Sequence, residues 1–263
     1  MSARFPPVPC PRNQVARNPG KRLGAFTKLR IRAGTGLVLL AAAGFAGCVV
    51  DAVSGPVRRE NRIIPRDTSE TARVDLRMGA GELRVNGGTG DLMDAVFNYN
   101  VSTWKPQVHY RSFAGRADLS VRQPEGSRHF GNSKYDWDLR LNDEIPMDVL
   151  VHFGAGEARL NLGSLNLRSL EVDMGVGEIN LDLRGTPRRD YEVRIRGGVG
   201  EATVHLPTDA GIYAIAQGGI GEIKVRGLRQ EGRHWVNDLY GNAKTQIRVD
   251  VRGGIGGINL LLE

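Results

Sequence analysis

Apolar and polar residues alternate with a period of two through most of the chain after residue 70. Leu170, Val172 and Met174 form one such run, with Glu171 and Asp173 between them. A period of two is that of a β-strand that buries one face. Because no helix-length run with a period of 3.6 follows residue 70, the pattern predicts an all-β fold.

The alternation slips by one residue at a glycine in several of these runs. The step from Val176 to the next apolar residue, Ile179, is three residues instead of two. In a straight strand such a slip would turn the buried face toward solvent. We therefore expect a bend or bulge at Gly177-Glu178, with the apolar residues before it, Val176 included, and those after it all facing one core.

Six segments repeat one phrase, in which a glycine, an aliphatic residue, a second glycine and usually a glutamate follow one another. The segments begin at Met78, Phe153, Met174, Gly197, Gly218 and Gly253. Copies two to five are 21, 23 and 21 residues apart, while the first stands 75 residues earlier and the last 35 residues later. This spacing predicts a β-solenoid with a short coil, an N-terminal elaboration and one insertion.

Four parts of the chain follow from these patterns. Residues 1–47 are predicted to be a signal peptide, and the polar segment 48–70 a tether. Shorter alternating runs separated by turn residues predict an N-terminal antiparallel β subdomain over residues 71–145. That subdomain continues into a short-coil β-solenoid of glycine-cornered repeats over residues 146–263.

The N-terminal segment has the anatomy of a bacterial lipoprotein signal. A basic stretch precedes an uncharged run of about 15 residues, which is short for a membrane span of roughly 20 residues. The run ends in Phe45-Ala46-Gly47-Cys48, which resembles the lipobox whose cysteine is acylated. We expect Cys48 to anchor the protein in a lipid bilayer of the cell envelope through several acyl chains. An ordinary cleaved signal or a short uncleaved anchor is the alternative.

The residue after Cys48 indicates which membrane would hold the lipoprotein. Val49 stands where an Asp commonly marks retention in the inner membrane, so we expect the outer membrane if the source is Gram-negative. Cys10 lies in the predicted leader, which leaves the mature chain without a pair of free cysteines. No disulfide framework is therefore expected.

Charge is unevenly distributed along the chain. The whole sequence holds 36 Lys and Arg against 29 Asp and Glu, a formal charge of +7 that suggests a nucleic-acid binder. Residues 1–47 contain eight of the bases and no acid, which leaves 28 bases and 29 acids in residues 48–263. The body is nearly neutral, so we expect no nucleic-acid partner.

The glycine phrase does not match the motifs of two common binding sites. A dinucleotide fingerprint needs a third glycine and a following helix, whereas strands follow here. A calcium-roll repeat has a nine-residue period, against 21 to 23 here. The sequence also lacks a Gly-X-Ser-X-Gly or His-Glu-X-X-His motif, so we expect no catalytic residues, metal or cofactor. A solenoid carbohydrate enzyme remains an alternative on architecture alone.

Two features could carry binding. The first is the set of glutamates that close the phrases, which stacking would bring to one edge: Glu82, Glu157, Glu178, Glu201 and Glu222. They either accept backbone N–H bonds at the corners with Arg interleaved, or form a row for a cation or cationic ligand. The second is the segment 227–243, where His234, Trp235 and Tyr240 either bind a ligand or pack over the solenoid.

Three stretches resemble one known family: WDLRL at 137–141, FGAGEARLNL at 153–162, and the run from 167 to 183 that contains GVGE. From about residue 70 to 263 the chain is similar to the toast-rack domain family, whose proteins resemble the C-terminal domain of LiaF, a bacterial cell-envelope stress regulator. The resemblance implies no catalytic residues. It does not carry over control of a kinase, because LiaF has transmembrane helices that this chain lacks.

The sequence therefore predicts a non-enzymatic lipoprotein of the bacterial cell envelope that acts as a structural or interaction module, with a role in the envelope stress response. Its partner would be an envelope protein or ligand that the sequence does not identify. The alternative is a sensor that binds an envelope ligand or cation at the glutamate edge or at the 227–243 segment.

Overall fold

The computed structural model describes residues 55–124 and 133–263. In these two ranges the regular elements are strands, apart from one short 3-10 turn, η1 (Ser102–Trp104). The strands are β1 (Arg58–Ile64), β2 (Thr71–Thr89), β3 (Met93–Tyr99), β4 (Gln107–Phe113), β5 (Arg116–Arg122), β6 (Tyr135–Asn142), β7 (Met147–Asn161), β8 (Leu167–Asp182), β9 (Tyr191–Leu206), β10 (Gly211–Gln217), β11 (Ile223–Arg226), β12 (Arg229–Glu231), β13 (His234–Val236) and β14 (Gln246–Leu262). The all-β prediction is confirmed.

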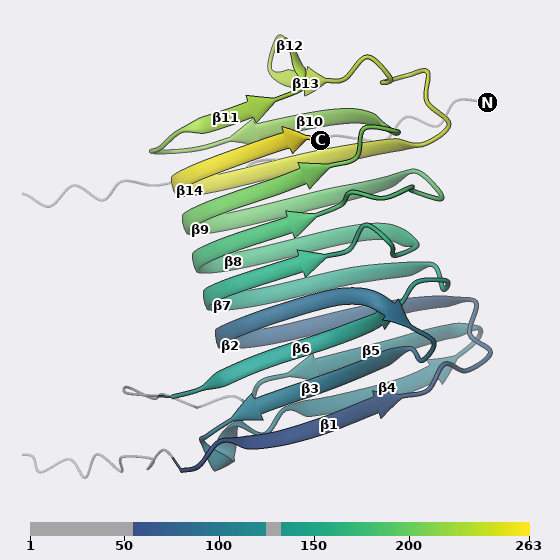
Figure 1. Cartoon of the computed structure of the whole chain (residues 1–263), viewed down its shortest axis with the longest axis vertical. Coiled ribbons are helices and arrows are strands. Elements are labelled where there is room, and N and C mark those ends of the chain that lie inside the picture. The colour runs from purple at the N-terminus through teal and green to yellow at the C-terminus, as the bar shows by residue number, and fades with distance from the viewer. Residues whose placement is uncertain (1–54, 125–132) are drawn as a thin grey trace, which may run out of the picture. The chain divides into compact units, whose positions relative to one another are not determined.

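Five long strands are the repeated units of the fold, and we call them rungs. β2, β7, β8, β9 and β14 each run through a glycine phrase and bend there, so that each has a first arm and a second arm (Figure 1). Neighbouring rungs are parallel and in register on both arms, with the phrases aligned. The first arms form one wall, the second arms form another, and the core lies between them.

Burial follows the predicted alternation on both arms of a rung. In β8, Leu170 and Val172 are buried on the first arm and Ile179 and Leu181 on the second, so the shifted alternation does keep one core. The prediction that Val176 faces the core is wrong, because this residue is 54% exposed. The bend lies around Val176 itself, which therefore stands at the outer vertex of the rung and not in the core.

The second glycine of each phrase is required by the close approach of neighbouring rungs. Gly177 has a φ of +137°, a region that side chains rarely adopt. A Cβ at this position would lie 1.9 Å from the carbonyl oxygen of Gly156 on the adjacent rung. The same crowding occurs at the equivalent glycines of the other rungs, so the phrase is a backbone requirement of stacking.

The stack does not follow chain order at its C-terminal end. β14 pairs with β9 on one side and with β10 and β11 on the other, so the last phrase lies between the fourth and the fifth (Figure 1). β10 and β11 together form the outermost rung, with Ile220 of its bend bridged to Ile255 of β14. The predicted insertion contains the β12–β13 hairpin, which pairs with the outer edge of β10 at Tyr213 and Ala214.

The other end of the stack is a rung made of two separate strands. β5 pairs in parallel with the first arm of β2, and β6 pairs in parallel with its second arm. Antiparallel strands then extend the two walls, β4 beside β5 and β3 beside β6. The predicted antiparallel subdomain is therefore continuous with the solenoid, and its first strand, β2, is already a rung.

One boundary of the predicted tether is wrong. Arg58–Ile64 forms β1, which pairs with β3 over all seven residues, although it lies within the 48–70 segment. β1 has no alternating apolar pattern because it is an edge strand, and Ile64 is its one buried residue. Charged residues such as Arg59 and Arg62 on such a strand discourage pairing with other chains.

Aromatic residues fill the core at this end. Trp137 and Phe97 are almost completely buried, with ring centroids 5.5 Å apart in an edge-to-face contact. Trp104 packs against Tyr135 at 5.3 Å in the same way. The two tryptophans of this region are thus core residues that fill this end of the stack.

Candidate functional site

The predicted lipidation site lies outside the described residues. The structure therefore says nothing about Cys48, the signal peptide or the membrane that would hold the protein, and these stay predictions. Within residues 55–124 and 133–263, no helix has the length and apolar character needed to cross a membrane.

Four of the predicted glutamates stand side by side on the second wall. Glu82, Glu157, Glu178 and Glu201 are register partners on β2, β7, β8 and β9, about 5 Å apart from strand to strand. Two of the four are held by a base two residues further along the same strand. Arg84 lies 2.6 Å from Glu82, and Arg159 pairs with Glu157.

The row is interrupted before its fifth member. Gly257 of β14 lies between Glu201 and Glu222, because β14 is inserted in the stack. Glu222 pairs with Lys224 at 3.0 Å, and Asn259 donates to Glu201. In the described part of the chain, His, Cys, Asp and Glu side chains form no group of three or more that could hold a metal ion.

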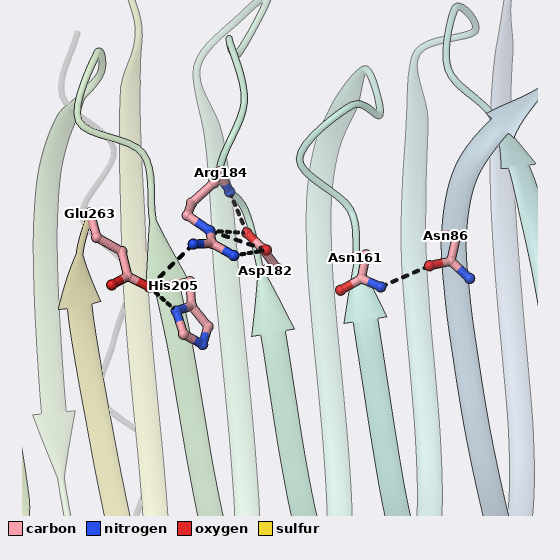
Figure 2. Close-up of polar contacts among 6 residues, drawn as sticks. All are labelled: Asn86, Asn161, Asp182, Arg184, His205 and Glu263. Atoms are coloured by element: carbon pink, nitrogen blue, oxygen red, sulfur yellow. Dashed lines mark hydrogen bonds and ion pairs between the residues drawn. The ribbon is translucent and has the colours of Figure 1, made fainter.

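Polar side chains lie in a row at the far ends of the second arms (Figure 2). Asn161 donates to Asn86 across β7 and β2 at 2.8 Å. Further along, the Arg184 guanidinium hydrogen-bonds Asp182 and holds the pKa of that carboxyl below its usual value. Glu263 accepts from Arg184 and contacts His205 of β9, which attaches the end of the inserted rung to its neighbours.

The 227–243 segment folds back as the β12–β13 hairpin over the outer end of the first wall. Trp235 is partly buried and packs against the core. The other two predicted residues of this segment contact Tyr213 of β10. The His234 ring stacks on the Tyr213 ring with centroids 4.6 Å apart, and the Tyr240 ring centroid lies 5.4 Å from it. Trp235 thus has a packing role, whereas His234 and Tyr240 remain at the surface.

Two residues that the sequence did not point to hold this segment in place. The buried Asn237 accepts from the Ile212 N–H at 2.8 Å and donates to the Ala210 carbonyl at 2.7 Å. Arg248 of β14 places its guanidinium 4.7 Å from the centre of the Tyr213 ring. The alternating pattern indicates only that the side chains of Tyr213 and Arg248 point away from the core. Their contact depends on the pairing of β10 with β14, which the pattern does not predict.

The bend vertices form an apolar ridge that was also missed. The ridge consists of the middle residues of the phrases, in stacking order Ala80, Ala155, Val176, Val199, Ile255 and Ile220. Its last four members are 54%, 44%, 53% and 71% exposed. Contiguous exposed apolar side chains on four successive rungs are unusual on a monomer and mark interaction surfaces.

These features define a class of protein: a β-solenoid-like stack of bent, parallel, in-register strands with long rows of side chains on its outer surfaces. The chain belongs to the toast-rack family. The model of that family described as "N-terminal domain of toast_rack, DUF2154" matches residues 53–205.

One solved structure agrees with this membership. A candidate cell adhesion protein from Clostridium sporogenes is 33% identical, with a TM-score of 0.77, over 79% of this chain and 100% of that chain. A candidate adhesin from Bacteroides fragilis is 12% identical over 78% of this chain and 97% of that chain, and its TM-score of 0.31 is too low to support an argument. A search of curated proteins found no match.

Proposed function

We propose that this protein is a non-enzymatic interaction module of the bacterial cell envelope, which contacts a partner through the apolar ridge. The observation that carries the proposal is the exposure of Val176, Val199, Ile255 and Ile220 along one line. The strands that carry these residues are held together by close contacts between the second glycines of neighbouring phrases, which we call the glycine ladder. Because this backbone is rigid, the ridge loses little conformational entropy on binding. Similarity to a candidate cell adhesion protein supports the same class of function.

The ridge can be tested by making it polar without touching the core. We expect the Val176→Ser, Ile255→Ser variant to retain the wild-type melting temperature within a few degrees, because both side chains are more than half exposed. Photo-crosslinking in intact envelopes, with the probe residue at 199, should yield an adduct with the wild-type chain and at least about tenfold less with the variant.

A matched control is available away from the ridge. Phe113 of β4 is 83% exposed, so Phe113→Ser makes a similar apolar-to-polar change elsewhere on the surface. The Phe113→Ser variant should keep the adduct. Equal adduct yields for the ridge variant and the control would show that the ridge is not the contact surface.

The membrane anchor is part of the proposal. We infer that acylated Cys48 holds the module on the envelope, in the outer membrane if the source is Gram-negative, and that this placement serves the envelope stress response. Replacement of the acylated thiol removes every acyl chain, so Cys48→Ala should abolish incorporation of labelled palmitate and move the protein to the soluble fraction. A Cys10→Ala variant is the control and should remain in the membrane. Membrane association of Cys48→Ala at the wild-type level would contradict the anchor.

A further inference from the structure

An open groove of about 1070 Å³ runs along the first wall beside the bends of β2, β7, β8 and β9. Four first glycines of the phrases line it: Gly79, Gly154, Gly175 and Gly198. Their missing side chains allow close stacking of the rungs, since a Cβ on Gly154, Gly175 or Gly198 would lie 2.1, 2.5 or 2.4 Å from the carbonyl oxygen of the glycine on the adjacent rung. The floor of the groove is thus tightly packed backbone. The groove uses different residues from the apolar ridge, and the inference drawn from it goes beyond the function proposed above.

The side chains that line the groove carry a net positive charge. Three are arginines, Arg122 on β5, Arg77 on β2 and Arg196 on β9, and one is an acid, Asp173 on β8. His152 on β7 stands between the two ends of this row. Asp75 pairs with both Arg77 and Arg122, and Glu171 pairs with Arg196, but neither acid lines the groove. The side chains that face the groove therefore carry +2 with a neutral histidine, while Asp75 and Glu171 behind them balance this charge.

Arg77 and Arg196 are each fixed by part of the guanidinium group only, whereas Arg122 donates to Ser120 through Nε and to Asp75 through Nη2. Arg77 donates to Asp75 through Nε, at 3.0 and 3.1 Å, and Arg196 donates through Nη1 to Glu171 at 2.6 Å and to Asp173 at 3.3 Å. Within the described ranges, both Nη groups of Arg77 and the Nε and Nη2 groups of Arg196 donate to no protein acceptor. These N–H groups are oriented in advance and suit a carboxylate, which an arginine can bind through two parallel bonds.

The spacing of the arginines selects the kind of ligand. Arg122 and Arg77 are register partners, whereas Arg196 is three rungs away from Arg77, about 14 Å at the usual separation of strands. In an extended peptide, residues i and i+4 point to the same side and are about 13 Å apart. A peptide that crosses the rungs can thus place one carboxylate at each end of the groove.

We propose that this groove binds an extended acidic peptide segment, with carboxylates at i and i+4 held by the Arg77–Arg122 pair and by Arg196. The side-chain amide of Gln107 also lines the groove and can bond the peptide backbone. Gln123 can do so only through its Nε2 group, because its Oε1 already accepts from the N–H groups of Gly79 and Ala80. Phe153, the one Phe, Tyr or Trp among the described lining residues, is buried, so the groove offers none of these rings as a platform on which a sugar could stack.

The test uses fluorescently labelled deca-glutamate as the probe and the full-length protein. Fluorescence anisotropy should show binding that the Arg77→Gln, Arg196→Gln variant weakens at least about tenfold, because two charge-assisted contacts are lost. The charge-matched control is Arg84→Gln, Arg159→Gln on the second wall, which should change the affinity less than about twofold. Thermal melting of both variants shows whether each is folded.

Further arms separate the alternatives. A peptide with glutamates only at i and i+4 should bind more tightly than one with glutamates at i and i+2. The Val176→Ser, Ile255→Ser ridge variant should bind deca-glutamate like the wild type, which keeps this test independent of the proposed function. Equal weakening by the control variant, no binding of deca-glutamate, or tighter binding of polygalacturonate would each overturn the proposal.

Discussion

Substitution of Gly200 by alanine is expected to prevent folding or to lower the free energy of unfolding by more than about 4 kcal/mol. Gly200 is the second glycine of the β9 phrase, with a φ of +137°. That conformation alone costs a non-glycine residue about 1–3 kcal/mol. A Cβ there would also lie 1.7 Å from the carbonyl oxygen of Gly177, on a backbone that is itself fixed by pairing on both sides.

The strain that Gly200→Ala introduces cannot be relieved by a local movement of the backbone. Its own carbonyl oxygen lies beneath Gly256 of β14 in the same way, so β8, β9 and β14 are in contact through three successive glycines. To admit a methyl group, β9 would have to move away from β8 and break ladder hydrogen bonds along both arms. Urea denaturation followed by circular dichroism measures the resulting loss of stability.

Gly197→Ala on the same strand is the control for this prediction. Gly197 has no positive φ, and the nearest atoms to an added Cβ are 4.0 Å away. The unfolding free energy of Gly197→Ala should therefore stay within about 1 kcal/mol of the wild type, or rise, because alanine restricts the unfolded chain. If Gly200→Ala unfolds at the same urea concentration as Gly197→Ala, the glycine ladder does not limit stacking.

The sequence predicted the rungs well because their pattern is local. A period of two with a slip at a glycine reports burial on the two arms of one strand, and the same slip recurs in each phrase. The exposure of Val176 was missed because an aliphatic residue fits the alternation equally well on either side of the bend. β1 was missed because its exposed edge position leaves only Ile64 as an apolar signal.

The order of the rungs could not be predicted, since it depends on pairing between distant parts of the chain. All six phrases carry the same glycines at the bend, so any rung can stack on any other as far as local pattern is concerned. Residues 207–210 carry the chain from β9 past one position in the stack to β10, and β14 later fills that position. The gap in the glutamate row at Gly257 follows directly from this insertion.

The apolar ridge and the groove are both made of residues from successive rungs, so they depend on the order in which the rungs stack. Engineered disulfides report that order directly. Thr203 of β9 and Asn259 of β14 are register partners, and the Asn259 side chain donates to Thr203 at 3.1 Å. Asn259 is also the partner of Lys224 on β11, which places Thr203 and Lys224 two rungs apart.

The decisive measurement is the yield of disulfide in a Cys10→Ala, Cys48→Ala background after mild oxidation of the folded protein. The Thr203→Cys, Asn259→Cys pair should cross-link almost completely, because adjacent strands separate Cα atoms by about 5 Å, within the range of a disulfide. The Thr203→Cys, Lys224→Cys pair, about 10 Å apart, should not cross-link. The opposite result, a disulfide in the second pair and none in the first, would mean that the rungs stack in chain order and would contradict the account.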